Sequence, residues 1–211
     1  MLARIQHAQR VFRHAARQRI GLLGGSFNPA HDGHAHITNL ALRHLRLDAV
    51  WWLVSPQNPF KARSGMSSFR DRFNSAVNAA SACGYGRKMV VSDLELRLGT
   101  SRTADTLRLL KRRMPMCRLV WIMGADNLAS FHRWHQSHRI ARLMPIAVIN
   151  RPGTRCGVLN GPGAARIGTR SSPRRIAARL GEARRWCFIP GPLNRQSATA
   201  IRHRVNESPE T

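Results

Sequence analysis

The sequence has few acidic residues and very few lysines. Its 211 residues include 10 Asp and Glu, and only 3 of its 35 basic residues are lysines, so the formal net charge is +25. A charge of this size favours anionic partners and is compatible with nucleic-acid binding. The arginines are spread along most of the chain, however, with few aromatic residues between them. An enzyme with anionic substrates therefore explains the charge better than an RNA-binding protein, which remains the alternative.

The sequence also lacks a Cys-x-x-Cys pair, a secretory signal and any apolar run as long as a membrane span. The four cysteines are far apart and are expected to be reduced thiols in a cytoplasmic protein with no membrane association. Residues 1–18 contain four arginines and no acid. We interpret them as a basic N-terminal extension, with a mitochondrial targeting segment as the alternative.

Two common phosphate-binding motifs are missing, Gly-x-x-x-x-Gly-Lys-Ser/Thr and Gly-x-Gly-x-x-Gly, which excludes a Walker loop and a dinucleotide fingerprint. Residues 19–34 instead predict a short buried strand, a glycine-rich turn and a helix that begins near Gly33. A helix that follows such a turn directs its free N–H groups and positive dipole end toward a ligand. His31 and His34 are three residues apart, so they share a face if the first turn is helical. The combination predicts a site for a polyphosphate.

The remaining pattern alternates apolar runs with amphipathic segments. The runs predict strands at residues 49–54, 88–92, 118–124, 145–150 and 186–189. The sequence therefore predicts one α/β domain over residues 19–206, with a parallel sheet and helices on both faces, followed by a tail at 207–211. Within it, residues 151–185 are predicted to form an arginine-rich peripheral loop that leads into a helix.

Two helix starts can be predicted in more detail. Ser67 or Ser68 is a plausible N-cap for a helix whose apolar stripe comprises Phe69, Phe73, Val77 and Ala80. The cluster of Ser and Thr at residues 100–103 is expected to cap the helix that follows it.

Two motifs at opposite ends of the chain resemble those of the nucleotidylyltransferase superfamily. The signature Gly-x-Phe-x-Pro-x-His-x-Gly-His is matched at every position, by Gly25, Phe27, Pro29, His31, Gly33 and His34. Residues 196–202 resemble the Ile-Ser-Ser-Thr-x-Ile-Arg motif of adenylyltransferases, with Ser197, Thr199 and Arg202 matching and Gln196 and Ala198 departing from it. Hydroxyl groups, helix amides and an Arg fork would make a second anion clamp there.

Within the superfamily, the middle of the chain resembles the bacterial nicotinate-nucleotide adenylyltransferases. The resemblance runs from about Ile20 to Arg204. Its segments are Ser55–Lys61, Thr103–Leu107, Gly124–Trp134 (through Gly124, Asp126, Leu128, Phe131 and Trp134) and Arg151–Gly153. Some members carry an aromatic residue after Trp134 and another before Thr103, where this chain has His135 and Arg102.

The resemblance implies a Rossmann-like fold of the adenylyltransferase type and an enzyme of NAD biosynthesis. Its reaction would transfer AMP from ATP to nicotinate mononucleotide, giving deamido-NAD and pyrophosphate. Mg²⁺ is expected with ATP, bound mostly through phosphates and water, and the chain carries no metal-ligand cluster of its own. The alternative acceptors are nicotinamide mononucleotide, phosphopantetheine or a flavin, and the oligomeric state is left open.

The resemblance also implies roles for individual residues. His31, His34 and Arg202 would be catalytic, by stabilising charge on the phosphates. The residues expected to join them in binding ATP are Gly24, Gly25, Ser26, Phe27, Gly124, Asp126, Ser197 and Thr199. The residues expected to bind the pyridine nucleotide are Lys61, Thr103, Trp134 and Arg151. Asp126 could bind the adenosine ribose or help to hold the metal, and the sequence does not choose between them.

Overall fold

The computed structural model describes residues 17–56, 66–151 and 156–192. Four predicted site residues lie outside these ranges, namely Lys61, Ser197, Thr199 and Arg202. The predicted C-terminal helix, the tail at 207–211 and nearly all of the basic extension are outside them too.

The described residues form a seven-stranded sheet with the order β3-β2-β1-β4-β5-β7-β6. Every neighbouring pair of strands is parallel. The strands are β1 (Arg19–Gly25), β2 (Ala49–Val54), β3 (Met89–Ser92), β4 (Arg118–Gly124), β5 (Ile146–Ile149), β6 (Thr169–Arg170) and β7 (Arg185–Ile189). The predicted strands and the α/β class are thus confirmed.

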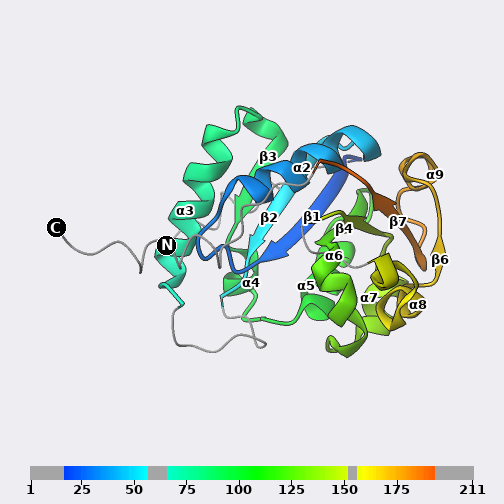
Figure 1. Cartoon of the computed structure of the whole chain (residues 1–211). Coiled ribbons are helices and arrows are strands. Elements are labelled where there is room, and N and C mark those ends of the chain that lie inside the picture. The colour runs from blue at the N-terminus through cyan, green and yellow to red at the C-terminus, as the bar shows by residue number, and fades with distance from the viewer. Residues whose placement is uncertain (1–16, 57–65, 152–155, 193–211) are drawn as a thin grey trace.

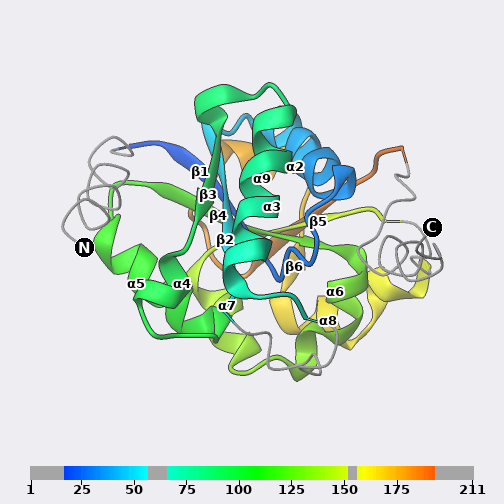
Figure 2. The ribbon, with the colours of Figure 1, turned by 90° about the vertical axis from the view of Figure 1, so that its left-hand side faces the viewer.

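Helices cover both faces of this sheet (Figures 1 and 2). One face carries α2 (Asp32–Leu45), α3 (Phe69–Ala82) and α9 (Pro173–Ala178). The other carries α4 (Leu94–Arg97), α5 (Thr103–Arg113), α6 (Ala125–Ser130), α7 (Ser137–Leu143) and α8 (Pro162–Ile167). Three short 3-10 turns complete the order, η1 (Gly86–Lys88), η2 (Phe131–Arg133) and η3 (Cys156–Asn160). No helix among the described residues is long and apolar enough to span a membrane.

The central strands are apolar throughout because both of their faces are covered. Every residue of β2 is buried, and its side chains alternate between the two cores. Trp51 packs in the core under α5 and α7, whereas Trp52 packs in the core under α2 and α3. A continuous apolar run is what a parallel strand buried on both faces requires.

The direction of the strand order reverses at the pair β1 and β4. Leu23 of β1 pairs with Ile122 of β4, so Gly25 and Gly124 end their strands at the same edge. In open α/β sheets, ligands bind at the carboxyl ends of the strands where the order reverses. The glycine-rich turn after β1 and the Gly124–Asp126 segment after β4 both leave the sheet at this point.

Three local predictions need correction. Ser68 does cap α3, accepting from the N–H of Asp71 at 3.2 Å. Val77, however, is 38% exposed, and the buried residues of the helix are Arg72, Ala76 and Ala80. The N-cap of α5 is Arg102, without a side-chain cap hydrogen bond, because Thr100 Oγ1 instead accepts from the backbone N–H of Arg102. The segment before the predicted helix is no long loop, because η3, α8 and β6 lie within residues 156–170 and Ile167 of α8 is buried against the sheet, whereas the helix predicted around Ile176 is present as α9.

Candidate active site

His31 and His34 lie side by side at the start of α2, with ring centroids 4.0 Å apart. His31 is the N-cap, and its Nδ1 accepts a hydrogen bond of 3.0 Å from the N–H of Gly33. Nδ1 of His34 accepts from the N–H of His31 at 3.2 Å. These two bonds close a capping box in which histidines replace the usual hydroxyl and carboxylate. They also hold both rings against the helix terminus.

The same hydrogen bonds decide which nitrogen of each ring carries the proton. A ring nitrogen that accepts an N–H is unprotonated, so the proton of a neutral imidazole lies on Nε2. Burial, the largest cause, and the charge of Arg151 together lower the pKa of His31 to about 4, while the charge of Asp32 acts in the opposite direction. His31 is therefore neutral at pH 7 and keeps Nε2–H as a donor for an anion.

An aromatic cluster of Phe27 and Trp52 packs against the ring of His34. The Phe27 ring is only 1% exposed and lies 4.7 Å from His34 and 5.1 Å from Trp52. Trp52 Nε1 donates to Thr38 Oγ1 at 2.8 Å, one helical turn after His34. The backbone of Phe27 has a φ of 48°, which an aromatic residue rarely adopts. Its side chain thus positions His34 from inside the fold, so any contact of Phe27 with a nucleotide would use its backbone.

Gly24 and Gly25 are favoured in the turn because neighbouring aromatic rings leave little room for a side chain. A Cβ at Gly24 would collide with the Trp121 ring, and one at Gly25 would lie 3.2 Å from the Phe27 ring. The two glycines therefore let these aromatic rings pack directly on the backbone.

A second group of predicted residues gathers at the end of β4. Arg151 donates from Nη1 to Oδ2 of Asp126 at 3.3 Å. Gly124 leaves room for this pair, since its Cβ would meet Oδ1 of Asp126 and lie 2.6 Å from Cδ of Arg151. The charge of Arg151 lowers the pKa of His31, and β1 and β4, the strands that precede the histidines and Gly124, are neighbours in the sheet. Three predicted site residues from two separate segments, Gly124, Asp126 and Arg151, are thus brought together.

Arg72 of α3 joins the loops around the site, a role that sequence reasoning missed. Its guanidinium is 2% exposed and donates to the carbonyl oxygens of Ser26 at 2.7 Å, Ser55 at 2.8 Å, Pro56 at 2.9 Å and Ser67 at 3.1 Å. Burial lowers its pKa. The sequence could have indicated this burial, because Arg72 lies three residues after Phe69 on the apolar stripe of an amphipathic helix.

Glu95 is a second missed residue, buried beside the segment that contains Thr103. It is 5% exposed, and Thr106 Oγ1 donates to its carboxyl group at 3.0 Å. Burial raises its pKa to about 7, although hydrogen bonds from Thr106 and Ser55 act in the opposite direction. Glu95 thereby connects α5 to the end of β2.

Thr103 and Trp134, predicted to bind the pyridine end, lie on segments that meet. Thr103 is the first residue of α5, and Trp134 follows η2, half-buried against Phe131 at a centroid distance of 5.6 Å. Trp134 Nε1 donates to Ser130 Oγ at 3.4 Å. The segments meet through the residues next to them, since Arg102 Nη1 and His135 Nε2 are 3.2 Å apart.

Comparison with known proteins agrees with this geometry. Residues 22–204 match the model of the cytidylyltransferase-like family. A probable nicotinate-nucleotide adenylyltransferase of Caulobacter sp. (strain K31) is 46% identical over 188 residues, covering 88% of this chain and 97% of that one. Its counterpart in Gluconobacter oxydans is 46% identical over 197 residues, 92% of this chain and 98% of that one.

This chain belongs to the nicotinate-nucleotide adenylyltransferase family. The family consists of nucleotidyltransferase enzymes, and the resemblance of the motifs is thereby confirmed. Two solved structures of the Plasmodium falciparum nicotinic acid mononucleotide adenylyltransferase share the fold. One, complexed with NaAD, has a TM-score of 0.67, and the other, complexed with APC, has 0.64. Each is 16% identical in sequence and covers 88% of this chain and 83% of that chain.

Proposed function

We propose that this adenylyltransferase family member transfers AMP from ATP to nicotinate mononucleotide, producing deamido-NAD and pyrophosphate. The observation that supports this most is the pair of imidazoles at the β1–β4 edge, whose Nδ1 atoms are both occupied by backbone N–H groups. Two Nε2–H donors at a helix N-terminus suit a phosphate group on which negative charge increases. The relatives at 46% identity carry this activity in their names.

The chemistry needs little beyond alignment and charge stabilisation. A 5′-phosphate oxygen of the mononucleotide attacks the α-phosphorus of ATP, and a new P–O bond forms. The bond from the α-phosphorus to the oxygen that bridges to the β-phosphate breaks, and pyrophosphate leaves with the electron pair. The attacking oxygen is already ionised at neutral pH, so no general base is required.

The described site residues would bind different parts of the substrates. His31 and His34 would donate to the α-phosphate, and Gly24, Gly25 and Ser26 would contact the nucleotide through the backbone. Asp126, which is paired with Arg151, would hold the adenosine ribose or help to hold the metal, and Arg151 would bind the mononucleotide. Thr103 and Trp134 would bind the nicotinate end, where an indole face attracts the electron-poor pyridinium ring.

The proposal extends to four residues outside the described ranges. Arg202, with Ser197 and Thr199, would hold the β- and γ-phosphates, and Lys61 would hold the phosphate of the mononucleotide. These assignments follow the family motifs in the sequence.

Mg²⁺ would arrive with ATP in this proposal. Within the described ranges, no group of three or more His, Cys, Asp or Glu residues could hold a metal ion. So few protein ligands there suit a cation that phosphates and water hold, with the Asp126 carboxylate nearby. The ion would supply neutralisation of the triphosphate charge.

The test is pyrophosphate release from ATP and Mg²⁺ with each acceptor in turn. We expect turnover with nicotinate mononucleotide and none above background with phosphopantetheine. Turnover with phosphopantetheine alone would reject the proposal. High-affinity RNA binding with a steep salt dependence and no pyrophosphate release would favour the RNA-binding alternative.

A further inference from the structure

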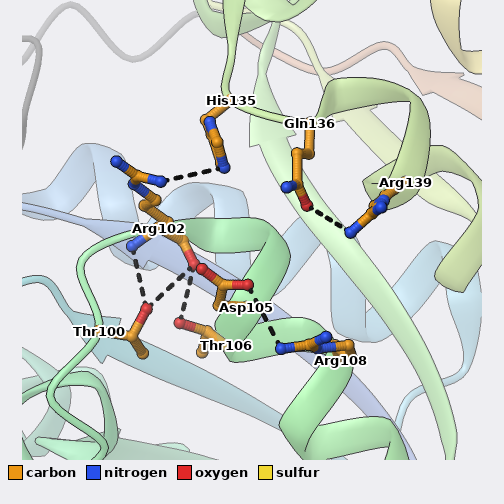
Figure 3. A network of polar contacts seen from close by, with 8 residues as sticks. All are labelled: Thr100, Arg102, Asp105, Thr106, Arg108, His135, Gln136 and Arg139. Carbon is orange, nitrogen blue, oxygen red and sulfur yellow. Dashed lines mark hydrogen bonds and ion pairs between the residues drawn. The ribbon is translucent and has the colours of Figure 1, made fainter.

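Arg102 and His135 flank the proposed pyridine site and contact each other across 33 residues of sequence. Arg102 Nη1 lies 3.2 Å from Nε2 of His135 (Figure 3). Arg102 directly precedes Thr103, and His135 directly follows Trp134. The contact therefore joins the two segments that would hold the nicotinate ring, and it places a guanidinium group between them.

The backbone of Arg102 is held firmly in this position. Thr100 Oγ1 accepts from its N–H at 3.2 Å (Figure 3), and its carbonyl oxygen accepts from the backbone N–H groups of Asp105 at 3.0 Å and Thr106 at 3.2 Å. Thr106 is itself buried and bonded to the buried Glu95 at 3.0 Å. A guanidinium that extends from a fixed backbone can be oriented by one further contact, which His135 supplies.

The guanidinium retains donors for an anion. A guanidinium has five N–H donors, and the contact with His135 uses one of them. Among the residues that the structure describes, Arg102 forms no ion pair with a carboxylate, and Asp105 in the first turn of α5 is paired with Arg108 at 3.7 Å. The 11-residue helix α5 begins here without a side-chain cap, so its N-terminal N–H groups add positive potential.

We propose that Arg102, oriented by His135, binds the carboxylate of the nicotinate ring and makes the enzyme select the acid over the amide. This inference rests on the proposed function. A carboxylate can accept charge-assisted hydrogen bonds from the fork, whereas the amide of nicotinamide presents one neutral carbonyl oxygen and an NH₂ donor that opposes other donors. Arg102 would touch the substrate, and His135 would act as its positioning residue.

The test compares kcat/KM for nicotinate mononucleotide and nicotinamide mononucleotide in matched variants. We expect R102A to lower the ratio of acid to amide at least tenfold, mainly through a higher KM for the acid, with the KM for ATP unchanged. R102K should recover part of the ratio, since it keeps the charge without the fork. H135A should lower the ratio less and should add nothing in the R102A background.

R108A is the control, because Arg108 is an exposed arginine on the same helix that is paired with Asp105. It should leave the ratio unchanged. A ratio within twofold of the wild type in R102A, or an equal drop in R108A, would overturn the role of Arg102 while leaving the proposed function intact. A wild-type enzyme with no turnover on nicotinate mononucleotide would overturn both.

Discussion

The backbone N–H of Gly33 donates to Nδ1 of His31 at 3.0 Å, which holds an imidazole in the place where a helix usually has a hydroxyl or carboxylate cap. The bond has two consequences. It satisfies one of the free N–H groups of α2, and it keeps the His31 proton on Nε2. The His31 side chain therefore both caps α2 and serves as a donor in the proposed active site.

His34→Ala should lower kcat for AMP transfer by two or more orders of magnitude. The substitution removes a donor to the α-phosphate, and the loss of one such transition-state donor costs about 10²–10³ in rate. Steady-state pyrophosphate release measures the effect, with circular dichroism to check the fold. His44→Ala, an exposed position in the last turn of the same helix, is the control. Near-normal turnover in the His34 variant would refute the role.

The neutral state of His31 should make the protein less stable as the pH falls from about 6.5 to about 4. In this interval the unfolded chain binds a proton on His31 that the folded chain excludes, because the pKa in the fold is about 4. The loss is on the order of 2–3 kcal/mol. Urea unfolding of wild type and His31→Asn at pH 7 and pH 4.5 tests this, since Asn can still cap the helix and does not titrate. Equal pH dependence in both proteins would contradict the expectation.

Glu95 should act in the opposite direction. Burial raises its pKa to about 7, so the folded protein holds a proton there that the unfolded chain loses above about 4.5, and stability falls as the pH rises through this interval. Glu95→Gln removes the buried charge and keeps an acceptor for Thr106. Relative to wild type, this variant should gain on the order of 2–3 kcal/mol between pH 5 and pH 8, as measured by urea unfolding. A constant difference across this range would show that Glu95 does not titrate there.

Arg72→Lys should loosen the loops around the histidines. Lysine keeps the positive charge but cannot reach four carbonyl oxygens with a planar fork, so several of the bonds to Ser26, Ser55, Pro56 and Ser67 would be lost. We expect a loss of about 2–4 kcal/mol in stability and faster amide exchange at the turn after β1. Arg70→Lys, an exposed position on the same helix, should change neither. Unchanged exchange in the Arg72 variant would remove Arg72 from the support of the site.

Trp134→Ala should weaken the binding of nicotinate mononucleotide and leave the affinity for ATP largely unchanged. The indole is half-buried, so part of its surface is available to stack on a pyridine ring. Isothermal titration with each substrate separates the two effects. An equal loss for both substrates would indicate that Trp134 supports the fold of the whole site.

The sequence by itself determined the parts of this protein that depend on local pattern. The strands at 49–54 and 118–124 follow from apolar runs, and the pairing of His31 with His34 follows from their spacing at a helix start. Only the tertiary structure decided the neutrality of His31, the burial of Arg72 and Glu95, and the contact of Arg102 with His135. These properties depend on desolvation and on neighbours from 11 to more than 100 residues away in sequence, because folding alone sets which side chains share an environment.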